Sequence, residues 1–210
     1  MFLIHLVMQE SLKKIKNPVI LEFGVNRGRS SQRFLNHVEE FGGDIFSIDI
    51  KDCSNITTSK KWNFFQCNDT DHKKIISKFP KLNNGIDLLF IDSYHDPSHV
   101  KRLLERWFIY VKKDGYIYFD DTESYVYRIK RNNILSIIND AISNVVKDFY
   151  YSNYDDLIYT KYYEGSGLSE FVKLSEMGTK PKFKKIWKYN FIFAKIYLLL
   201  KNLKYKAFKS

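Results

Sequence analysis

Acidic and amide side chains follow five apolar segments of this chain, and one histidine stands close behind one of them. The positions are Glu22, Asp49, Asn68 with Asp69, Asp92, and Asp120 with Asp121. Carboxylate oxygens accept hydrogen bonds from hydroxyl groups, and they are the ligands that hard divalent cations prefer. His95 lies three residues after Asp92, and an imidazole can take a proton from a hydroxyl near neutral pH. These residue types suit ligand binding, cation binding and acid–base chemistry.

A glycine-containing turn follows the first of these segments. Residues 19–21 are apolar and indicate a buried strand, Glu22 ends it, and Gly24 and Gly28 precede a helical pattern over residues 30–38. A strand, a glycine turn and a helix in this order bring backbone N–H groups and a helix N-terminus against a ligand. The spacing E-x-G-x-x-x-G is not the dinucleotide fingerprint G-x-G-x-x-G. The alternative is a turn that only packs a strand against a helix.

Predicted strands and helices alternate along the chain. Further strands are expected at residues 44–49, 62–66, 86–91 and 116–119, and helices at 10–15, 97–111 and 131–146. Residues 149–154 and 169–174 are expected to form an antiparallel pair around residues 165–167. This order predicts an α/β fold with a doubly wound, mostly parallel, seven-stranded sheet. Ligands bind at the C-terminal ends of the strands in such sheets, which is where the acidic residues stand.

The glycine turn resembles motif I of the S-adenosylmethionine (SAM)-dependent methyltransferases with a Rossmann-like fold. The resemblance implies that Glu22 lies near the methionine end of SAM. It also implies that the turn through Gly24, Gly28 and Ser30 approaches the cofactor closely.

The next two strand ends are expected to hold the nucleoside part of the cofactor. A carboxylate at Asp49 can accept hydrogen bonds from both hydroxyls of a ribose, and the resembled family uses that position so. A solvated strand end is the alternative. The resemblance places Asn68 or Asp69 against the adenine, and the sequence does not decide between them. Asn68 stands where many family members carry an acid.

Residues 86–123 resemble a metal-dependent branch that includes the macrocin O-methyltransferases and the cephalosporin hydroxylase-like proteins. Members carry D-x-x-H after the fourth strand, a Trp-containing helix end, a K-x-G-G-like turn and a strand ending in acid-Asp. The matching positions here are 92–95, Trp107, 113–115 and 120–121. Asp114 departs from the pattern, because glycine is common there. The resemblance covers roughly residues 17–175, and it implies that His95 is the general base and that Asp92 also lies beside the cofactor.

A cation site can be argued without the family. Neighbouring strands lie about 4.8 Å apart, so Asp92, Asp120 and Asp121 should converge at one edge of the crevice. Three carboxylates in contact repel one another unless protons or a cation intervene, and all-oxygen ligation suits Mg²⁺, Mn²⁺ or Ca²⁺ rather than zinc. The alternatives are turn-forming roles for Asp120 and Asp121, a helix N-terminal charge at Asp92, and helix capping by His95.

Composition and charge indicate the domain organisation and the cellular compartment. A chain of 210 residues with 44% hydrophobic residues fits one globular domain, expected at residues 1–176. Cys53 and Cys67 form no metal-binding spacing, so a reducing, cytoplasmic compartment is expected. The net charge of +10 comes from residues 177–210, which hold ten lysines and no acid, while residues 1–176 hold 24 basic and 24 acidic residues.

This basic, aromatic tail is expected to be helical. It could pack on its own domain, contact an anionic membrane through residues 182–206 at the inner face of the membrane, or serve as a dimer arm. Nucleic acid is a less favoured partner of the tail.

The expected function is SAM-dependent O-methylation of a hydroxyl group on a small molecule, sugar or glycan, with a divalent cation, most readily Mg²⁺. The alternatives are a methyltransferase-like RNA-binding protein that uses the tail, and a non-catalytic scaffold of the same fold.

Overall fold

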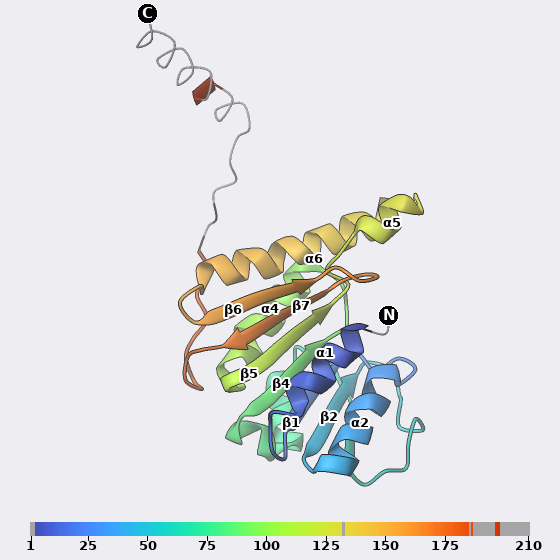
Figure 1. The fold of residues 1–210 in the computed structure, drawn as a ribbon. Helices are drawn as coiled ribbons and strands as arrows, with labels where there is room; N and C mark the ends of the chain where they lie inside the picture. The colour runs from blue at the N-terminus through green and yellow to red at the C-terminus, as the bar shows by residue number, and fades with distance from the viewer. Residues whose placement is uncertain (1–2, 132, 185, 187–195, 198–210) are drawn as a thin grey trace, which may run out of the picture.

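The computed structural model describes residues 3–131, 133–184, 186 and 196–197. Its strands are β1 (Val19–Phe23), β2 (Asp44–Asp49), β3 (Trp62–Gln66), β4 (Ile86–Ile91), β5 (Val111–Asp120), β6 (Leu157–Tyr162) and β7 (Leu168–Lys173). Its helices are α1 (Leu3–Leu12), α2 (Arg29–Phe41), α3 (His72–Lys78), α4 (Pro97–Trp107), α5 (Tyr125–Ile129) and α6 (Asn133–Ser152), with 3₁₀ turns η1 (Pro80–Asn84) and η2 (Phe108–Tyr110). Figure 1 shows these elements as one sheet with helices on both of its faces.

The strands form one seven-stranded sheet in the order β3-β2-β1-β4-β5-β7-β6. The first five strands are parallel, and β7 pairs antiparallel with both β5 and β6. The order reverses direction at β1 and β4, which makes the sheet doubly wound. The predicted Rossmann-like fold class is therefore confirmed.

Each central strand supplies side chains to two cores, because alternate residues of a strand point to opposite faces. Leu21 and Phe23 of β1 pack with α4 and α6, whereas Ile20 packs with α1 and α2. All six residues of β4 are buried, which explains why its sequence is a continuous apolar run.

The prediction of a strand at residues 149–154 is wrong. This stretch continues α6 and then leaves it, and the antiparallel partner of β7 is β6 instead. Phe149 lies seven residues after Ile142 and three after Val146, so the three side chains share the buried face of one helix. Phe149 also packs against Phe171 of β7, with ring centroids 5.9 Å apart.

Other boundaries also differ from the predicted ones. The first helix spans Leu3–Leu12 and not 10–15, and α4 ends at Trp107 because Val111 already begins β5. The predicted turn at 113–115 lies inside β5 as an irregularity: Asp114 has a φ of 60° and the pairing with β4 shifts there.

The first residues of the predicted tail pack on the domain. The side chain of Asn153 binds both backbone groups of Lys182, accepting from its N–H at 2.8 Å and donating to its carbonyl at 3.0 Å. The backbone N–H of Lys184 donates to the hydroxyl of Ser152 at 3.0 Å. The helix expected beyond this point lies almost wholly outside the described residues. No helix in the described part of the chain is long and apolar enough to cross a membrane.

Candidate cofactor and metal site

A pocket of about 740 Å³ opens where β1, β2, β3, β4 and β5 end. Seven of the predicted site residues line it: Gly24, Asp49, Asn68, Asp69, Asp92, His95 and Asp121. Residues from five separate strand ends therefore meet in one cavity, as the doubly wound topology requires.

Asp49 fixes the turn that follows β1. One carboxylate oxygen accepts hydrogen bonds from the backbone N–H groups of Val25 at 2.8 Å and Asn26 at 3.0 Å, and the other accepts from Lys51 at 2.9 Å. Burial alone would raise the pKa of Asp49, but these backbone donors together lower it below its usual value. The side chain is therefore an ionised acceptor in the pocket wall, which fits the hydroxyl groups of a ribose.

Gly24 lies in tight contact with the end of β4. Its φ is 91°, and a Cβ atom at this position would come within 1.9 Å of the carbonyl oxygen of Asp92. The backbone N–H of Gly24 donates to Ile48, and that of Asp92 donates to Phe23, so three strand ends are joined here. Only glycine fits this conformation and this space.

Glu22 is fully buried and does not line the pocket, and its place near the methionine end of SAM stays a prediction. The carboxylate is fully buried and accepts hydrogen bonds from three hydroxyls, those of Ser30 at 2.5 Å, Ser31 at 2.7 Å and Ser47 at 2.6 Å. Burial raises the pKa of Glu22, and the three hydroxyl donors partly oppose that rise. Glu22 thus ties α2 and β2 to β1.

The close approach of Gly28 and Ser30 to the cofactor likewise stays a prediction. The Ser30 hydroxyl is occupied by Glu22, and neither residue lines the pocket. Gly28 precedes α2 with a φ of 70°, and a Cβ atom there would meet the side chain of Ile56. Both residues position the start of α2.

A Glu22→Ala variant should lose about 2–4 kcal/mol of unfolding free energy, because three buried hydroxyls lose their acceptor and a cavity remains. Urea denaturation measures this loss. Glu105→Ala, at an exposed position of α4, is the control and should change stability by less than about 0.5 kcal/mol. Equal stability of the two variants would contradict the supporting role of Glu22.

Asp92, Asp121 and His95 meet at the pocket mouth. The Nε2 atom of His95 lies 3.6 Å from Asp92 Oδ1 and 3.4 Å from Asp121 Oδ2. Asp120, the third predicted ligand, does not line the pocket; its carboxylate accepts the backbone N–H of Asp121 at 2.9 Å. Asp121 has a φ of 55°, an uncommon conformation for a residue other than glycine that is often found at functional sites.

The electrostatics of this cluster show that its negative charges are in excess. Burial raises the pKa of Asp92, and repulsion from Asp120 and Asp121 raises it further. Burial and then repulsion from Asp121 also raise the pKa of Asp120. Binding of protons or of a divalent cation would relieve this repulsion.

The oxygen atoms of these carboxylates are suitable ligands for a hard cation, but their present arrangement is not that of a metal site. Within the described residues, no three His, Cys, Asp or Glu side chains are gathered as the ligands of a metal ion. The imidazole of His95 lies between Asp92 and Asp121, so a cation shared by these two carboxylates requires this ring to move aside. Capping of α4 falls to Asp96, whose carboxylate accepts from the backbone N–H of His99 at 2.8 Å, and not to His95.

The two candidates for adenine contact have different surroundings. Asn68 uses its side-chain oxygen to close a turn with the N–H and hydroxyl of Thr70. Asp69 is buried in the pocket wall and lies 3.0 Å from Nε2 of His99. Both residues line the pocket, and Asp69 is the more rigidly held.

Several other pocket residues were not predicted from the sequence. They are Asn26, Ile48, Ile50, Lys51, Cys67, Ser93, Tyr94 and Arg102. Most adjoin a predicted residue in the chain. His99 stands one helical turn after His95 in the sequence, is expected from that spacing to face the same cleft, and lines the pocket. His99 and Arg102 are three residues apart on α4, and this spacing is a signal that could have placed them together on one helix face.

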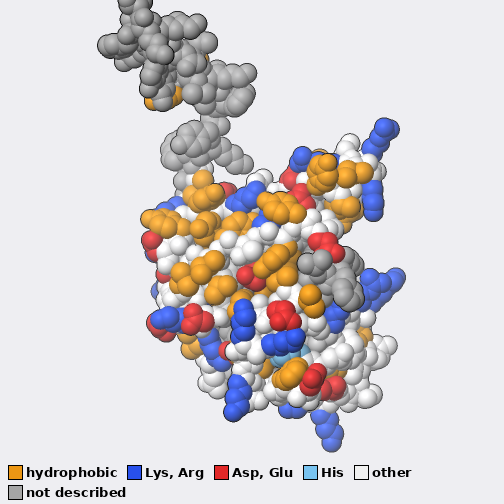
Figure 2. Space-filling view, in the orientation of Figure 1, with side chains coloured by type: hydrophobic (Ala, Val, Ile, Leu, Met, Phe, Trp, Pro, Cys, Tyr) orange, Lys and Arg blue, Asp and Glu red, His pale blue; other side chains and the backbone are white. Residues whose placement is uncertain are grey.

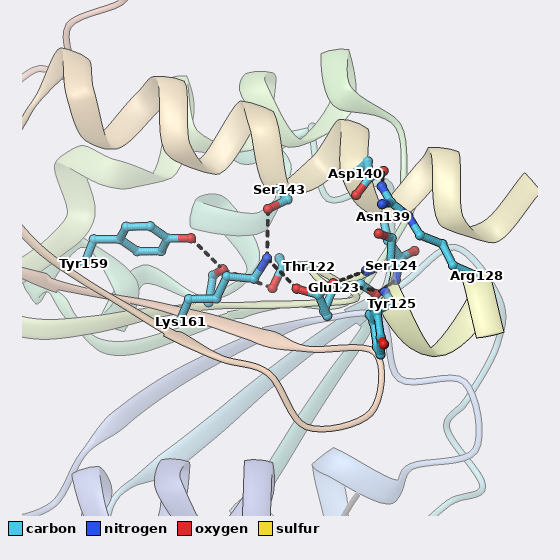
Figure 3. Close-up of polar contacts among 11 residues, drawn as sticks. Thr122, Glu123, Ser124, Tyr125, Arg128, Asn139, Asp140, Ser143, Tyr159 and Lys161 are labelled. Atoms are coloured by element: carbon cyan, nitrogen blue, oxygen red, sulfur yellow. Dashed lines mark hydrogen bonds and ion pairs between the residues drawn. The ribbon is translucent and has the colours of Figure 1, made fainter. Parts of the chain in front are cut away.

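The segment after the acidic pair is held by Glu123 (Figure 3). One oxygen of its carboxylate accepts the backbone N–H groups of Ser124 and Tyr125, and the other pairs with Lys161 at 3.0 Å. The backbone carbonyl of Glu123 accepts from Asn139 of α6 at 2.9 Å. These contacts fix the path from Asp121 to α5.

The sheet order, the glycine turn and the carboxylate at the end of β2 define a class I SAM-dependent methyltransferase fold. A family model described as a methyltransferase domain matches residues 21–122, which run from β1 past the acidic pair. This match covers just under half of the chain and agrees with the sequence resemblance to the SAM-dependent methyltransferases.

Solved structures agree on the fold. The chain is similar to SAH-bound methyltransferase PaMTH1 of Podospora anserina, with a TM-score of 0.62 and 13% identity over 82% of this chain and 79% of that one. It is also similar to MycE methyltransferase of the mycinamycin biosynthetic pathway in complex with Mg and SAH, with a TM-score of 0.58 and 14% identity over 87% of this chain and 51% of that one.

One curated sequence, uncharacterized protein R132 of Acanthamoeba polyphaga mimivirus, is 48% identical over 44 residues. This match spans 21% of the present chain and 20% of that protein.

Proposed function

We propose that this domain methylates a hydroxyl group of a sugar or glycan with the help of a divalent cation, most readily Mg²⁺. The observation that carries the proposal is the position of His95 between Asp92 and Asp121 at the mouth of the pocket. If SAM binds with its ribose at Asp49, a base and a set of hard oxygen ligands then lie beside the methionine end of the cofactor.

SAM supplies the electrophilic methyl group, and a cation held by Asp92, Asp120 and Asp121 would supply positive charge beside the acceptor oxygen. Asp49 accepts the ribose hydroxyls, and Gly24 allows the backbone to approach the cofactor. His95 takes the proton of the acceptor hydroxyl at Nε2. The acceptor oxygen would bond to the methyl carbon as the S–CH₃ bond of SAM breaks and SAH leaves, and the nearby acidic side chains would stabilise the protonated imidazole. Most of the catalysis comes from holding the two reactants in line.

Two observations support a sugar as the acceptor. The first is the resemblance of the segment 86–123 to the macrocin O-methyltransferase branch. Tyr94 is 69% exposed at the pocket wall, where its ring can pack against the apolar face of a sugar.

The proposal predicts cation-dependent methyl transfer to glycosides. With labelled SAM, transfer to a panel of glycosides should stop on addition of EDTA and return with excess Mg²⁺. Catechols and RNA are the comparison acceptors. Transfer that persists in EDTA would remove the cation from the mechanism. Transfer to RNA alone, with steeply salt-dependent RNA binding, would support the RNA-binding alternative.

A further inference from the structure

The hairpin formed by α5 and the first turns of α6 exposes a group of large apolar side chains. Tyr125, Ile129, Ile134 and Ile137 expose 67%, 67%, 72% and 67% of their surface. No residue of α5 is buried. Figure 1 shows this α5–α6 hairpin, residues 125–131 and 133–137, projecting past the body of the sheet. Single exposed isoleucines are ordinary on a protein surface, but four large apolar residues on one short projection form a patch.

Basic side chains are interleaved with the apolar ones. Arg128, Lys130 and Arg131 are exposed in this hairpin, and residues 125–137 contain no Asp or Glu in the sequence. Arg128 pairs with Asp140, which lies farther along α6. Figure 2 shows hydrophobic and basic side chains together on the projecting end at the upper right. The hairpin therefore combines an apolar tip with an excess of positive charge.

We infer that the α5–α6 hairpin docks on an anionic lipid surface. Exposed apolar side chains flanked by Lys and Arg suit the membrane interface, where the former enter the acyl boundary and the latter meet lipid phosphates. A second copy of the chain is a poorer occupant. In a two-fold contact the same patch faces itself, which would bring the cations at Lys130 and Arg131 toward their own copies without acids to balance them.

The hairpin is coupled to the site by a short, fixed connection. Only three residues separate Asp121 from the start of α5, and Glu123 holds them in place through Lys161 and Asn139. Docking through the hairpin would therefore set the pocket mouth close to the lipid surface. This inference does not rest on the proposed acceptor or cation. It also uses a surface different from the basic tail, whose residues lie mostly outside the described part of the chain.

The test is co-sedimentation of the full chain with vesicles of phosphatidylcholine alone or mixed with phosphatidylglycerol. One variant combines Ile129→Ser, Ile134→Ser and Ile137→Ser, and a second combines Lys130→Glu and Arg131→Glu. The matched control combines Ile158→Ser, on the exposed side of β6, with Lys60→Glu and Lys61→Glu on a distant loop. SAH affinity reports that each variant is folded, and Ile134→Ser alone replaces the triple variant if that variant fails this check.

The wild-type protein should co-sediment with the anionic vesicles and not with the neutral ones. Both hairpin variants should bind at least about tenfold more weakly, while the control binds like wild type. Hairpin variants that bind as tightly as wild type would overturn the inference and assign any binding to another basic segment. Failure of wild type to bind anionic vesicles would overturn it too. A dimer in sedimentation velocity that only the isoleucine variant dissociates, with vesicle binding unchanged, would assign the patch to self-association instead.

Discussion

A His95→Ala variant is expected to turn over about 10²–10⁴ times more slowly than wild type while SAH binds with unchanged affinity. In the described structure the Nε2 atom of His95 lies at the pocket mouth, between the carboxylates of Asp92 and Asp121. Removal of this imidazole leaves His99 in the pocket wall, where the Nε2 atom of that ring already lies 3.0 Å from the carboxylate of Asp69. Asp49 and Gly24, which face the cofactor, are untouched, so binding and turnover should separate.

Two further variants sharpen this test. His95→Gln keeps a polar side chain of similar reach without a basic nitrogen, and its turnover should fall as far as that of His95→Ala. His72→Ala on α3, which lies outside the pocket, should turn over like wild type. Unchanged turnover in His95→Ala would remove His95 from the mechanism. Loss of SAH binding would show that His95 shapes the cofactor pocket instead.

A Gly24→Ala variant is expected to lose SAH affinity by about 10²-fold. A Cβ atom at this position would lie 1.9 Å from the carbonyl oxygen of Asp92, so either the turn or the end of β4 must shift. The turn carries the N–H groups of Val25 and Asn26 that hold Asp49, and β4 leads into Asp92. In enzymes a displacement of about 1 Å in groups that position a reactant costs about 10²-fold in rate, and we expect a loss of affinity of the same order here.

Gly178→Ala provides a matched control for this prediction. Gly178 has a φ of 89°, close to the 91° of Gly24, but no heavy atom lies within 4 Å of the position its Cβ would take. Both variants therefore carry the same backbone strain, and only Gly24→Ala carries the collision. Titration calorimetry with SAH compares them. Equal affinities would show that the close approach at Gly24 is not needed for cofactor binding.

The strand ends could be predicted from the sequence because they depend on local patterns. The apolar run of β4 and the acids that end β2, β4 and β5 are visible in single segments, and parallel strands bring such ends together. The strand predicted at residues 149–154 failed because its aromatic residues suit either a strand or the buried face of a helix. In the structure Phe149 lies on the buried face of α6 together with Ile142 and Val146, so burial stabilises the helix.

The role of Glu22 could not be predicted from one segment. Its oxygens are taken by Ser30 and Ser31 from α2 and by Ser47 from β2, which lies 25 residues away in the chain. The pairing of Asp69 with His99 likewise joins residues 30 positions apart. Contacts of this kind depend on how strands and helices pack, and no sequence spacing signals them.

The most direct measurement is anomalous diffraction from crystals soaked with SAH and Mn²⁺. The account predicts SAH along Asp49 and one manganese peak in contact with the carboxylates of Asp92 and Asp121, with the His95 ring moved from between them. SAH in the pocket with no manganese at this cluster would contradict it.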